Sequence, residues 1–434
     1  MHKPLTVQEA PTIYQVMLDT PRVRQGYKQT EVGVIPEDWD ASTIGENSKW
    51  MSGGTPRRKN AEFWSGNIPW ISGSTLKDSE ISTSDQFLTA EAVAAGSKMA
   101  PVDSTLLLVR GSALHNEIRA GLVVLPVAFN QDVKALVPNP TIQPKYLTYY
   151  ILGYNEELLK LVSSAGNSAG VLDTELVQNF KFLKPPLPEQ RAIATALSDV
   201  DALLAAQNKL IAKKCDIKLA TMQQLLTGKT RLPGFNGKWD IKRLWEIADV
   251  LKGSGLSKGE ISDAGSRKCI LYGELFTFYG CVISEIKSRT NSDNGRVSIC
   301  GDVLVPGSTT TTGIDLATAS ALLEDDVALG GDINIIREKR NGSFDSAFLS
   351  NYLTFAKKRD IADRAQGITI IHLYGRDLLN MEVTLPSFQE QTAIAALLSD
   401  MDTELSALQK QRDKTIAIKQ CMMQELLTGR IRLV

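Results

Sequence analysis

The sequence predicts an α+β protein in which two mixed α/β domains are separated by two long helices. These helices form an antiparallel coiled coil, and the whole chain has an internal pseudo-twofold repeat. Three observations predict this fold: the second half repeats the first, two segments have an uninterrupted helical pattern, and the segments between them hold most of the Gly, Pro and Trp. At 434 residues the chain is long enough for several hydrophobic cores.

The repeat is clearest in two runs of the chain. Glu189–Asp199 returns as Glu390–Asp400, and Met222–Gly228 returns as Met423–Gly429, at a constant offset of 201 residues. More than half of the positions from 189 to 232 are identical to their counterparts. A duplicated fold suits a partner with twofold-like symmetry, of which double-stranded DNA is the commonest.

Weaker matches extend the repeat, with offsets that drift. Val109-Arg-Gly-Ser112 matches Val305-Pro-Gly-Ser308, and Trp70-Ile-Ser-Gly-Ser-Thr75 matches Tyr272-Gly-Glu-Leu-Phe-Thr277. The sequence therefore indicates two globular domains that diverged more than the segments following them. Short β-rich runs and many turn residues favour mixed α/β domains with long loops.

The repeated segments are expected to be helices of about 38 residues, or about 57 Å. Neither Gly nor Pro occurs between 189 and 226, and each copy ends on Thr-Gly, a natural C-cap (Gly228 and Gly429). Apolar residues recur at alternating spacings of four and three, the heptad pattern of a coiled coil: Ile193, Leu197, Val200, Leu204 and Ile394, Leu398, Met401, Leu405, Leu408. Polar residues then interrupt this seam, either to fix its register or to mark a protein-docking site: Gln207, Lys214, Arg412 and Thr415.

The composition favours a globular protein of the cytoplasm. It is 43% hydrophobic and 22% charged, and no apolar run approaches the roughly 18 residues that span a bilayer. No signal-peptide pattern opens the chain, and the five scattered cysteines favour reduced thiols. A net charge of −1 argues mildly against an autonomous DNA-binding protein.

Motifs at the domain ends resemble those of a known family. Pro185–Ala194 closes a variable domain, and a long helix follows that ends in Leu225-Leu-Thr-Gly-Lys-Thr-Arg-Leu232. This combination resembles the DNA-specificity subunit of Type I restriction-modification systems. Further similar motifs are Gly33–Trp39, Gly53-Gly-Thr-Pro56 followed by Gly66–Ile71, and Phe129-Asn-Gln-Asp132, where the second domain has Gly330-Gly-Asp332.

The resemblance covers almost the whole chain beyond the first 25 or so residues and implies a domain order. It implies an N-terminal segment (1–29), target recognition domain 1 (30–184), helical spacer 1 (185–232), target recognition domain 2 (233–384) and helical spacer 2 (385–434). The sequence leaves open whether residues 1–25 add a helix or strand that closes the structure near Val434.

The resemblance also implies a function and partners. Each recognition domain would read one half of a bipartite, asymmetric DNA site, while the helices set the spacer length and carry two methyltransferase subunits. Restriction endonuclease and translocase subunits would join them. S-adenosylmethionine, ATP and Mg would belong to those partners, with no cofactor bound by this chain.

The residues themselves predict no catalytic site and no metal site. No GxxxxGK[ST] loop is present, and Lys252–Lys258 lacks its spacing. Asn139-Pro-Thr-Ile142 does not complete the Asn-Pro-Pro-aromatic turn of amino-methyltransferases, and the three histidines are far apart. The alternative function is a coiled-coil scaffold that joins two protein partners without DNA readout.

DNA contact requires donors for phosphate and a few side chains that reach base edges. In the first domain, Arg57, Arg58 and Lys59 lie beside small residues, so we expect backbone and cations to approach the duplex. For Asn130 and Gln131, base readout and the bracing of neighbouring loops are equally good interpretations. The predicted contact residues are Thr55, Arg57, Arg58, Lys59, Ser72, Ser74, Thr75, Lys77, Arg110, Ser112, His115, Asn116, Asn130 and Gln131.

In the second domain, a run of hydroxyls after a predicted strand suits phosphate or base contacts, with a polar turn as the alternative. The predicted contact residues are Lys252, Ser254, Lys258, Lys268, Tyr272, Thr277, Ser308, Thr309 and Thr310. Since the net charge is near zero and the cations for phosphate are local to loops such as Arg57–Lys59, we expect weak, salt-sensitive DNA binding by the isolated chain and tight, specific binding only in complex.

Overall fold

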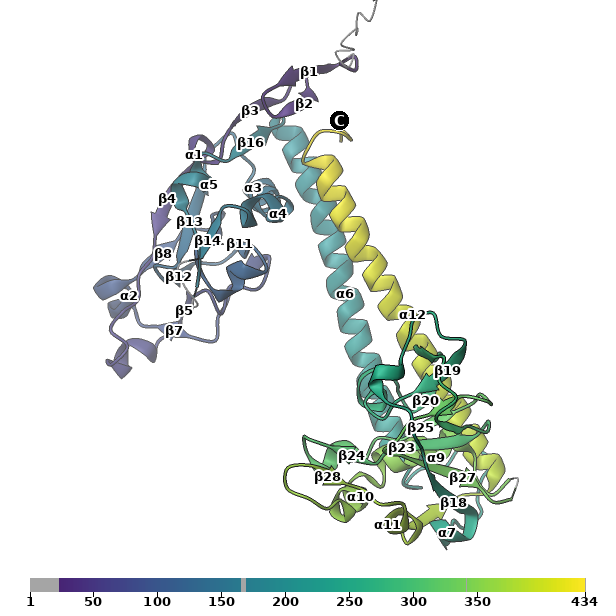
Figure 1. The fold of residues 1–434 in the computed structure, drawn as a ribbon. Coiled ribbons are helices and arrows are strands. Elements are labelled where there is room, and N and C mark those ends of the chain that lie inside the picture. Colours follow the sequence, from purple (N-terminus) through teal and green to yellow (C-terminus); the bar gives the residue numbers. More distant parts are fainter. Residues whose placement is uncertain (1–22, 165–168, 341, 434) are drawn as a thin grey trace, which may run out of the picture. The chain divides into compact units, whose positions relative to one another are not determined.

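The computed structural model describes residues 23–164, 169–340 and 342–433, and the first 22 residues of the predicted N-terminal segment lie outside this part. The chain forms two compact units (Figure 1). Unit 1 comprises Met1–Ala206 with Asp413–Val434, and unit 2 comprises Gln207–Arg412. Each unit therefore contains one globular domain and part of each long helix.

Unit 1 is built on a five-stranded sheet and a four-stranded sheet. The larger has the order β4-β13-β9-β11-β6, in which β11 and β6 are parallel and the other pairs antiparallel. Its strands are β4 (Ser48–Ser52), β13 (Val133–Pro138), β9 (Thr105–Leu108), β11 (Ala120–Val123) and β6 (Glu80–Ile81). The smaller is β7-β5-β12-β8, formed by Phe87–Leu88, Ile68–Ile71, Val127–Phe129 and Lys98–Ala100.

Smaller sheets and short helices complete unit 1. The remaining strands are β10 (Arg110–Gly111), β15 (Gly170–Leu172) and β14 (Val162–Ser164) in one sheet, β3 (Asp40–Thr43) with β16 (Lys181–Lys184), and β1 (Tyr27–Thr30) with β2 (Gly33–Pro36). The short helices are α1 (Ile44–Asn47), η1 (Ala61–Trp64), α2 (Ala90–Gly96), η2 (Ser112–His115), α3 (Pro144–Gly153), α4 (Asn155–Leu159) and α5 (Thr174–Gln178).

Unit 2 repeats both main sheets. The order β18-β27-β23-β25-β20 reproduces the five-stranded sheet, and β21-β19-β26-β22 forms the four-stranded one. Their strands are β18 (Ala248–Lys252), β27 (Ile333–Glu338), β23 (Asp302–Pro306), β25 (Ser320–Leu322), β20 (Val282–Ile283), β21 (Ser288–Thr290), β19 (Arg267–Ile270), β26 (Ala328–Leu329) and β22 (Arg296–Val297). The predicted internal repeat is thus present in three dimensions.

The rest of unit 2 consists of two strand pairs and short helices. The pairs are β17 (Asp240–Arg243) with β29 (Glu382–Leu385) and β24 (Ser308–Thr309) with β28 (Ile371–His372). The short helices are α7 (Leu244–Ile247), η3 (Lys258–Glu260), α8 (Glu274–Thr277), η4 (Gly313–Leu316), α9 (Ser346–Phe355), α10 (Lys358–Arg364) and α11 (Gly375–Leu379).

The sheet registers correct two of the sequence matches. Leu108 pairs with Val133 as Pro306 pairs with Ile333, so Arg110 corresponds to Ser308 and not to Pro306. Likewise, Trp70 pairs with Ala128 as Cys269 pairs with Ala328. Cys269, not Tyr272, therefore occupies the position of Trp70. Both matches were wrong because loop insertions and deletions shift the offset between strands that have little sequence in common.

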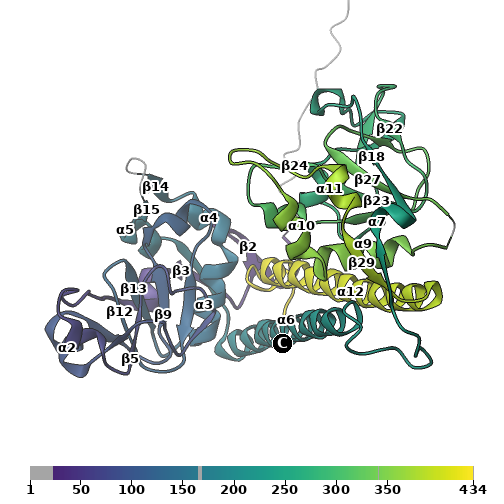
Figure 2. The same cartoon turned by 90° about the horizontal axis from the view of Figure 1, so that it is seen from below.

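The long helices are α6 (Leu187–Leu225) and α12 (Phe388–Leu426), and Figures 1 and 2 show them side by side. In unit 2, Lys214 pairs with Glu404 and Lys218 with Asp402, so one residue number rises as the other falls. In unit 1, Asp201 pairs with Lys419 at 2.6 Å. These pairs confirm the antiparallel arrangement. Gly228 and Gly429 have φ of +68° and +71°, the left-handed conformation of the expected C-caps.

The segments at the ends of the long helices, which are similar in the two repeats, hold each unit together. In unit 1, Arg432 donates from Nε and Nη2 to the two carboxylate oxygens of Glu189, at 2.6 and 2.8 Å. Trp39 Nε1 donates to the same carboxylate at 2.9 Å. In unit 2, Arg231 makes the same bidentate contact, donating from Nε and Nη2 to the two carboxylate oxygens of Glu390. Each pair joins the start of one long helix to the segment that follows the other.

The glutamine next to each of these glutamates binds the N-cap residue of a helix in the globular domain. Gln190 Oε1 accepts from Gln143 N, directly before α3, and Gln391 Oε1 accepts from Asp345 N, directly before α9. Gln143 and Asp345 then cap α3 and α9 with their own side chains. Buried apolar residues from both long helices complete each core, including Ile193 and Leu426 in unit 1. The Glu-Gln motif at the start of each long helix therefore links that helix to the globular domain.

We expect Arg432→Ala to destabilise unit 1 by about 3 kcal/mol, because it leaves a buried carboxylate without its cation. The Glu189 side chain is only 2% exposed. The matched control is Arg430→Ala, whose partner Glu425 and own side chain are far more exposed, and whose loss should cost about 0–1 kcal/mol. Denaturant unfolding of the full chain measures both, and equal losses would contradict the prediction.

Candidate nucleic-acid interface

In unit 1, the predicted cationic loop follows β4 and is held against its own domain. A Cβ atom on Gly53 would collide with the carbonyl oxygens of Phe129 and Asn130, and one on Gly54 with that of Gly96. The two glycines thus let the loop pass close to β12 and α2. The sequence interpretation assigned small residues here to close approach of the duplex, but their closest neighbours in the structure are backbone atoms of the same domain.

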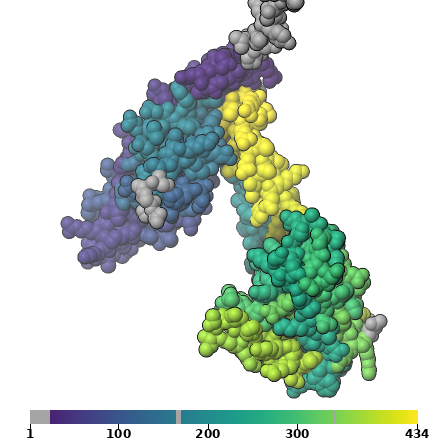
Figure 3. Space-filling model, in the orientation of Figure 1, coloured from purple at the N-terminus to yellow at the C-terminus, as the bar shows by residue number. Residues whose placement is uncertain are grey.

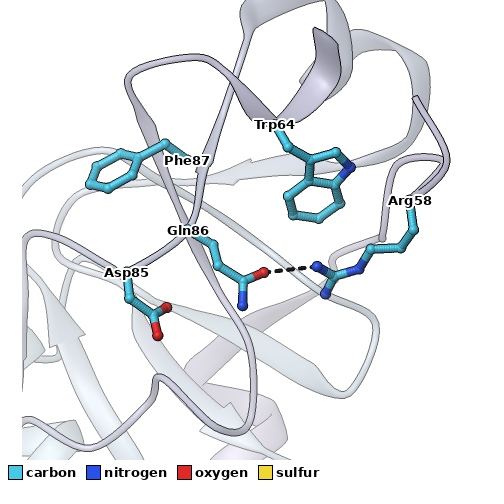
Figure 4. Close-up of a pocket in the computed structure, with 5 residues that line it drawn as sticks. All are labelled: Arg58, Trp64, Asp85, Gln86 and Phe87. Atoms are coloured by element: carbon cyan, nitrogen blue, oxygen red, sulfur yellow. Dashed lines mark hydrogen bonds between the residues drawn. The ribbon is translucent and has the colours of Figure 1, made fainter. Parts of the chain in front are cut away.

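The three cations of this loop differ in their surroundings. The guanidinium of Arg58 lies over the rings of Trp64 and Trp70, at 4.1 and 4.7 Å from the centroids. Its Nη1 donates to Gln86 Oε1 at 2.9 Å (Figure 4). Arg57 and Lys59 are exposed, and their side chains make no hydrogen bond or ion pair within the described residues.

Other predicted residues of unit 1 meet at neighbouring loops. Thr55 donates to Gln131 Oε1 at 2.6 Å. Gln131 and Arg110 line one cavity of about 350 Å³ together with Lys134. The turn of Ser72, Ser74 and Thr75 closes on itself through hydroxyl hydrogen bonds, and Arg119 donates to the carbonyl of Gly73 within it. The structure therefore brings the loops after β4 and β12 together with the start of β10.

The hydrogen bonds of Asn130 brace its own loop, which was the alternative to base readout. Its side chain is buried, donates to the carboxylate of Asp132 and accepts from the Asp132 backbone, each at 3.1 Å. Gln131, in contrast, is exposed. The remaining residues do not join this group in any common contact: Lys77 lines a separate cavity with Glu117 and Arg119, and Ser112, His115 and Asn116 lie exposed on and after η2.

In unit 2, five predicted residues line one cavity of about 680 Å³. They are Tyr272, Thr277, Ser308, Thr309 and Thr310. Tyr272 lies where the first repeat has Gly73, because its neighbour Leu271 takes the place of Ser72. The turn itself is kept, since Glu274 Oε2 accepts from Leu271 N at 2.7 Å just as Thr75 Oγ1 accepts from Ser72 N at 2.8 Å.

Two carboxylates give this cavity acceptor character. Asp332 accepts from Ser308 Oγ at 3.2 Å and pairs with Lys252 at 3.1 Å. Asp315 accepts from Thr311 and Thr312, and the hydrogen bond from the Thr311 hydroxyl is the main cause that lowers the pKa of Asp315. Hydroxyl donors, carboxylate acceptors and an exposed tyrosine ring are groups that can bind base edges.

The other predicted cations of unit 2 are dispersed. Lys268 is paired with Glu324 at 2.6 Å and lines no part of the cavity. Lys258 is exposed on η3, and Ser254 is exposed in the preceding loop. The loop of Lys258 is fixed by Glu260, which accepts from Ser257, Ser292 and Asn294.

Sequence reasoning missed several residues of these surfaces. Trp64 and Gln86 hold Arg58 in unit 1, while Phe276, Asp315 and His372 line the cavity of unit 2. Only the pairing of β24 with β28 brings His372 opposite Ser308, although the two are 64 positions apart in the chain. Local sequence offered no signal for these contacts, apart from Asp332, which stands in the Gly330-Gly-Asp332 motif.

No group of three His, Cys, Asp or Glu side chains in the described part of the chain is placed to hold a metal ion. Among the helices described, none has the length and apolar character that crossing a membrane requires.

The sequence profile of the Type I restriction modification DNA specificity domain matches this chain twice, at residues 36–213 and 236–417. The chain belongs to this family. Each match covers one globular domain together with most of the long helix that follows it.

Curated relatives agree with this assignment. The specificity subunit of the Type I restriction enzyme EcoR124I/EcoR124II from Escherichia coli is 34% identical over 179 residues, which is 41% of this chain and 43% of that protein. The chain thus spans less than half of that relative. The MjaVIII specificity subunit from Methanocaldococcus jannaschii is 26% identical over 435 residues, covering 94% and 96% of the two chains.

Solved structures share the fold. The S subunit of a Type I restriction-modification system from M. genitalium has a TM-score of 0.57 at 16% identity, over 89% of this chain and 96% of that one. A chain from a study of complex assembly and conformational transition of the type I R-M system has a TM-score of 0.56 at 16% identity, over 92% and 99%. At this identity the likeness concerns the fold alone.

Hydrogen bonds to Glu260, with that from Ser292 the largest cause, lower the pKa of its carboxyl to about 2 from an ordinary value of 4.5. Because the folded pKa is lower than the unfolded one, this contribution to stability is complete above about pH 4.5 and is lost as the pH falls towards 2. We expect Glu260→Gln to be less stable than the parent chain at neutral pH, with the difference shrinking below pH 4.5. Carboxyl NMR titration measures the midpoint directly, and a value near 4.5 would contradict the prediction.

Proposed function

We propose that this chain is the sequence-specific DNA-binding subunit of a Type I restriction-modification enzyme, and that it recognises a bipartite, asymmetric site. One observation carries the proposal: the two domains have main sheets of the same strand order but different residues at corresponding positions beside them. Arg110 of one domain corresponds to Ser308 of the other, and Gly73 corresponds to Tyr272. Domains that read the same half-site would carry the same side chains at these positions.

The long helices are the proposed platform for two methyltransferase subunits, which restriction and translocase subunits then join. Leu203, Leu210 and Ile217 are 50%, 41% and 41% exposed. They follow one another at intervals of seven and so lie on one face of α6, outside the buried seam. Ile416 and Ile418 are exposed on α12, whose end is visible at the surface in Figure 3. The seven-residue spacing of the exposed apolar residues on α6 supports docking of a partner protein there.

Catalysis is assigned by this proposal to the partner subunits. S-adenosylmethionine, ATP and Mg would bind there, and this chain would supply sequence recognition alone. The rival function, a scaffold that joins two proteins without DNA readout, accounts for the helices. It gives no reason for the exposed cations Arg57 and Lys59 on the cationic loop or for the polar cavity of unit 2.

Exchanging residues 30–184 for the matching domain of another specificity subunit should change one half of the methylated site and leave the other half unchanged. The reason is that unit 1 and unit 2 have separate cores, each closed by its own Glu–Arg pair. Methylation-aware sequencing of DNA from cells that express the chain with its methyltransferase provides the measurement. An unchanged methylation pattern would overturn the proposed function.

The isolated chain should bind DNA weakly because its net charge is −1, and its affinity should fall as salt rises because binding would depend on local cations such as Arg57 and Lys59. Fluorescence anisotropy with a labelled duplex at increasing salt measures this. Arg57→Ala and Lys59→Ala should each reduce the slope of log K against log salt by about 1. Nanomolar binding at physiological salt without methyltransferase would contradict the expectation.

A further inference from the structure

Arg58 differs from its two neighbours in that its side chain is held in place. Trp64 and Trp70 meet edge to face, with ring centroids 5.0 Å apart, and the guanidinium lies over both rings. Gln86 Oε1 accepts from Nη1, and the Gln86 carbonyl accepts from the backbone of Trp70 at 2.8 Å. Figure 4 shows Arg58, Trp64 and Gln86 around a cavity of about 340 Å³ that Asp85 and Phe87 also line.

Trp64, Trp70 and Gln86 form a clamp around Arg58. The clamp restricts the Arg58 side chain before any base is bound, so less conformational freedom is lost on binding. A free arginine loses that freedom at the moment of contact, which weakens binding and makes the contact tolerant of geometry. The clamp uses one donor of the guanidinium and covers its flat face, while Arg58 stays exposed. The other N–H groups form a fork of fixed orientation, as bidentate recognition requires.

The clamp occurs in unit 1 and is not part of the sheet arrangement that both units share. Trp70 lies in β5, and the corresponding position of β19 is Cys269, which has no ring to offer a cation. Unit 2 nevertheless forms the same four-stranded sheet. Folding of the domain therefore does not require an arginine above a tryptophan at this place.

We propose that Arg58 reads a guanine in the half-site of unit 1, while Arg57 and Lys59 contact phosphate. This inference rests on the proposed function and assigns a base to one side chain. Guanine offers O6 and N7 as adjacent acceptors in the major groove, which match the arginine fork. Phosphate contact needs no fixed orientation. Arg57 and Lys59 suit it because both are exposed and their side chains make no hydrogen bond or ion pair in the part of the chain that the structure describes.

The test uses the full chain in complex with its methyltransferase and a pool of duplexes randomised over the recognised half-sites. Methylated duplexes are then sequenced. The parent complex should require a G·C pair at one position of the half-site that the domain exchange assigns to unit 1. Arg58→Lys keeps the charge and loses the fork, so discrimination at that one position should fall about 10- to 100-fold. Discrimination in the other half-site should stay unchanged, which also shows that the variant is folded.

Arg57→Ala is the matched control and should lower methylation of all duplexes by a similar factor without relaxing any position. The inference is overturned if Arg58→Lys keeps the parent preference at every position, if it behaves like Arg57→Ala, or if no G·C pair is required in that half-site. A parent complex that methylates without sequence preference would overturn the proposed function and this inference together.

Discussion

Each unit depends on a buried glutamate that is neutralised by an arginine from the far end of the other long helix. Glu189 accepts from Arg432, Trp39 and the backbone of Leu433, so both of its carboxylate oxygens are occupied. A buried carboxylate without a partner is strongly destabilising, so the domain is complete only when the tail of α12 returns to the start of α6. Arg231 and Glu390 impose the same condition on unit 2.

This constraint explains which parts of the repeat kept their sequence. The Glu-Gln motif and the Thr-Gly-X-X-Arg-Leu motif are far apart within each copy, yet each copy of one contacts the other copy of its partner motif. Loss of the glutamate or of its arginine partner in either unit therefore costs stability. Loops such as that of Arg58 contain no residue of these buried glutamate–arginine pairs. Their side chains differ between the units while the sheets beneath them keep the same order.

The periodicity of the sequence was sufficient for the long helices, because heptad spacing and a terminal glycine act locally. The sequence held less information on how the polar residues of each domain are grouped in space. Thr55 contacts Gln131, Gln131 lines a cavity together with Arg110 of β10, and five hydroxyl or tyrosine residues share another cavity. The matching of Tyr272 with Trp70 failed, since strand register depends on pairing across the sheet and loop lengths had changed. The contacts of Arg58 with Trp64 and Gln86 could not be predicted from the sequence either. They join a loop, a short helix and the edge of a sheet.

The sequence by itself determined the duplication, the two helices with their C-caps, and the family to which the chain belongs. These follow from spacing and repeated motifs, which can be read along one dimension. Only the tertiary structure decided which of the many polar loop residues are free, paired or held. Arg57, Arg58 and Lys59 are adjacent cations of one loop, and nothing local distinguishes them. The packing of two tryptophans and a glutamine makes one of them rigid, because contacts between distant strands fix where a side chain can go.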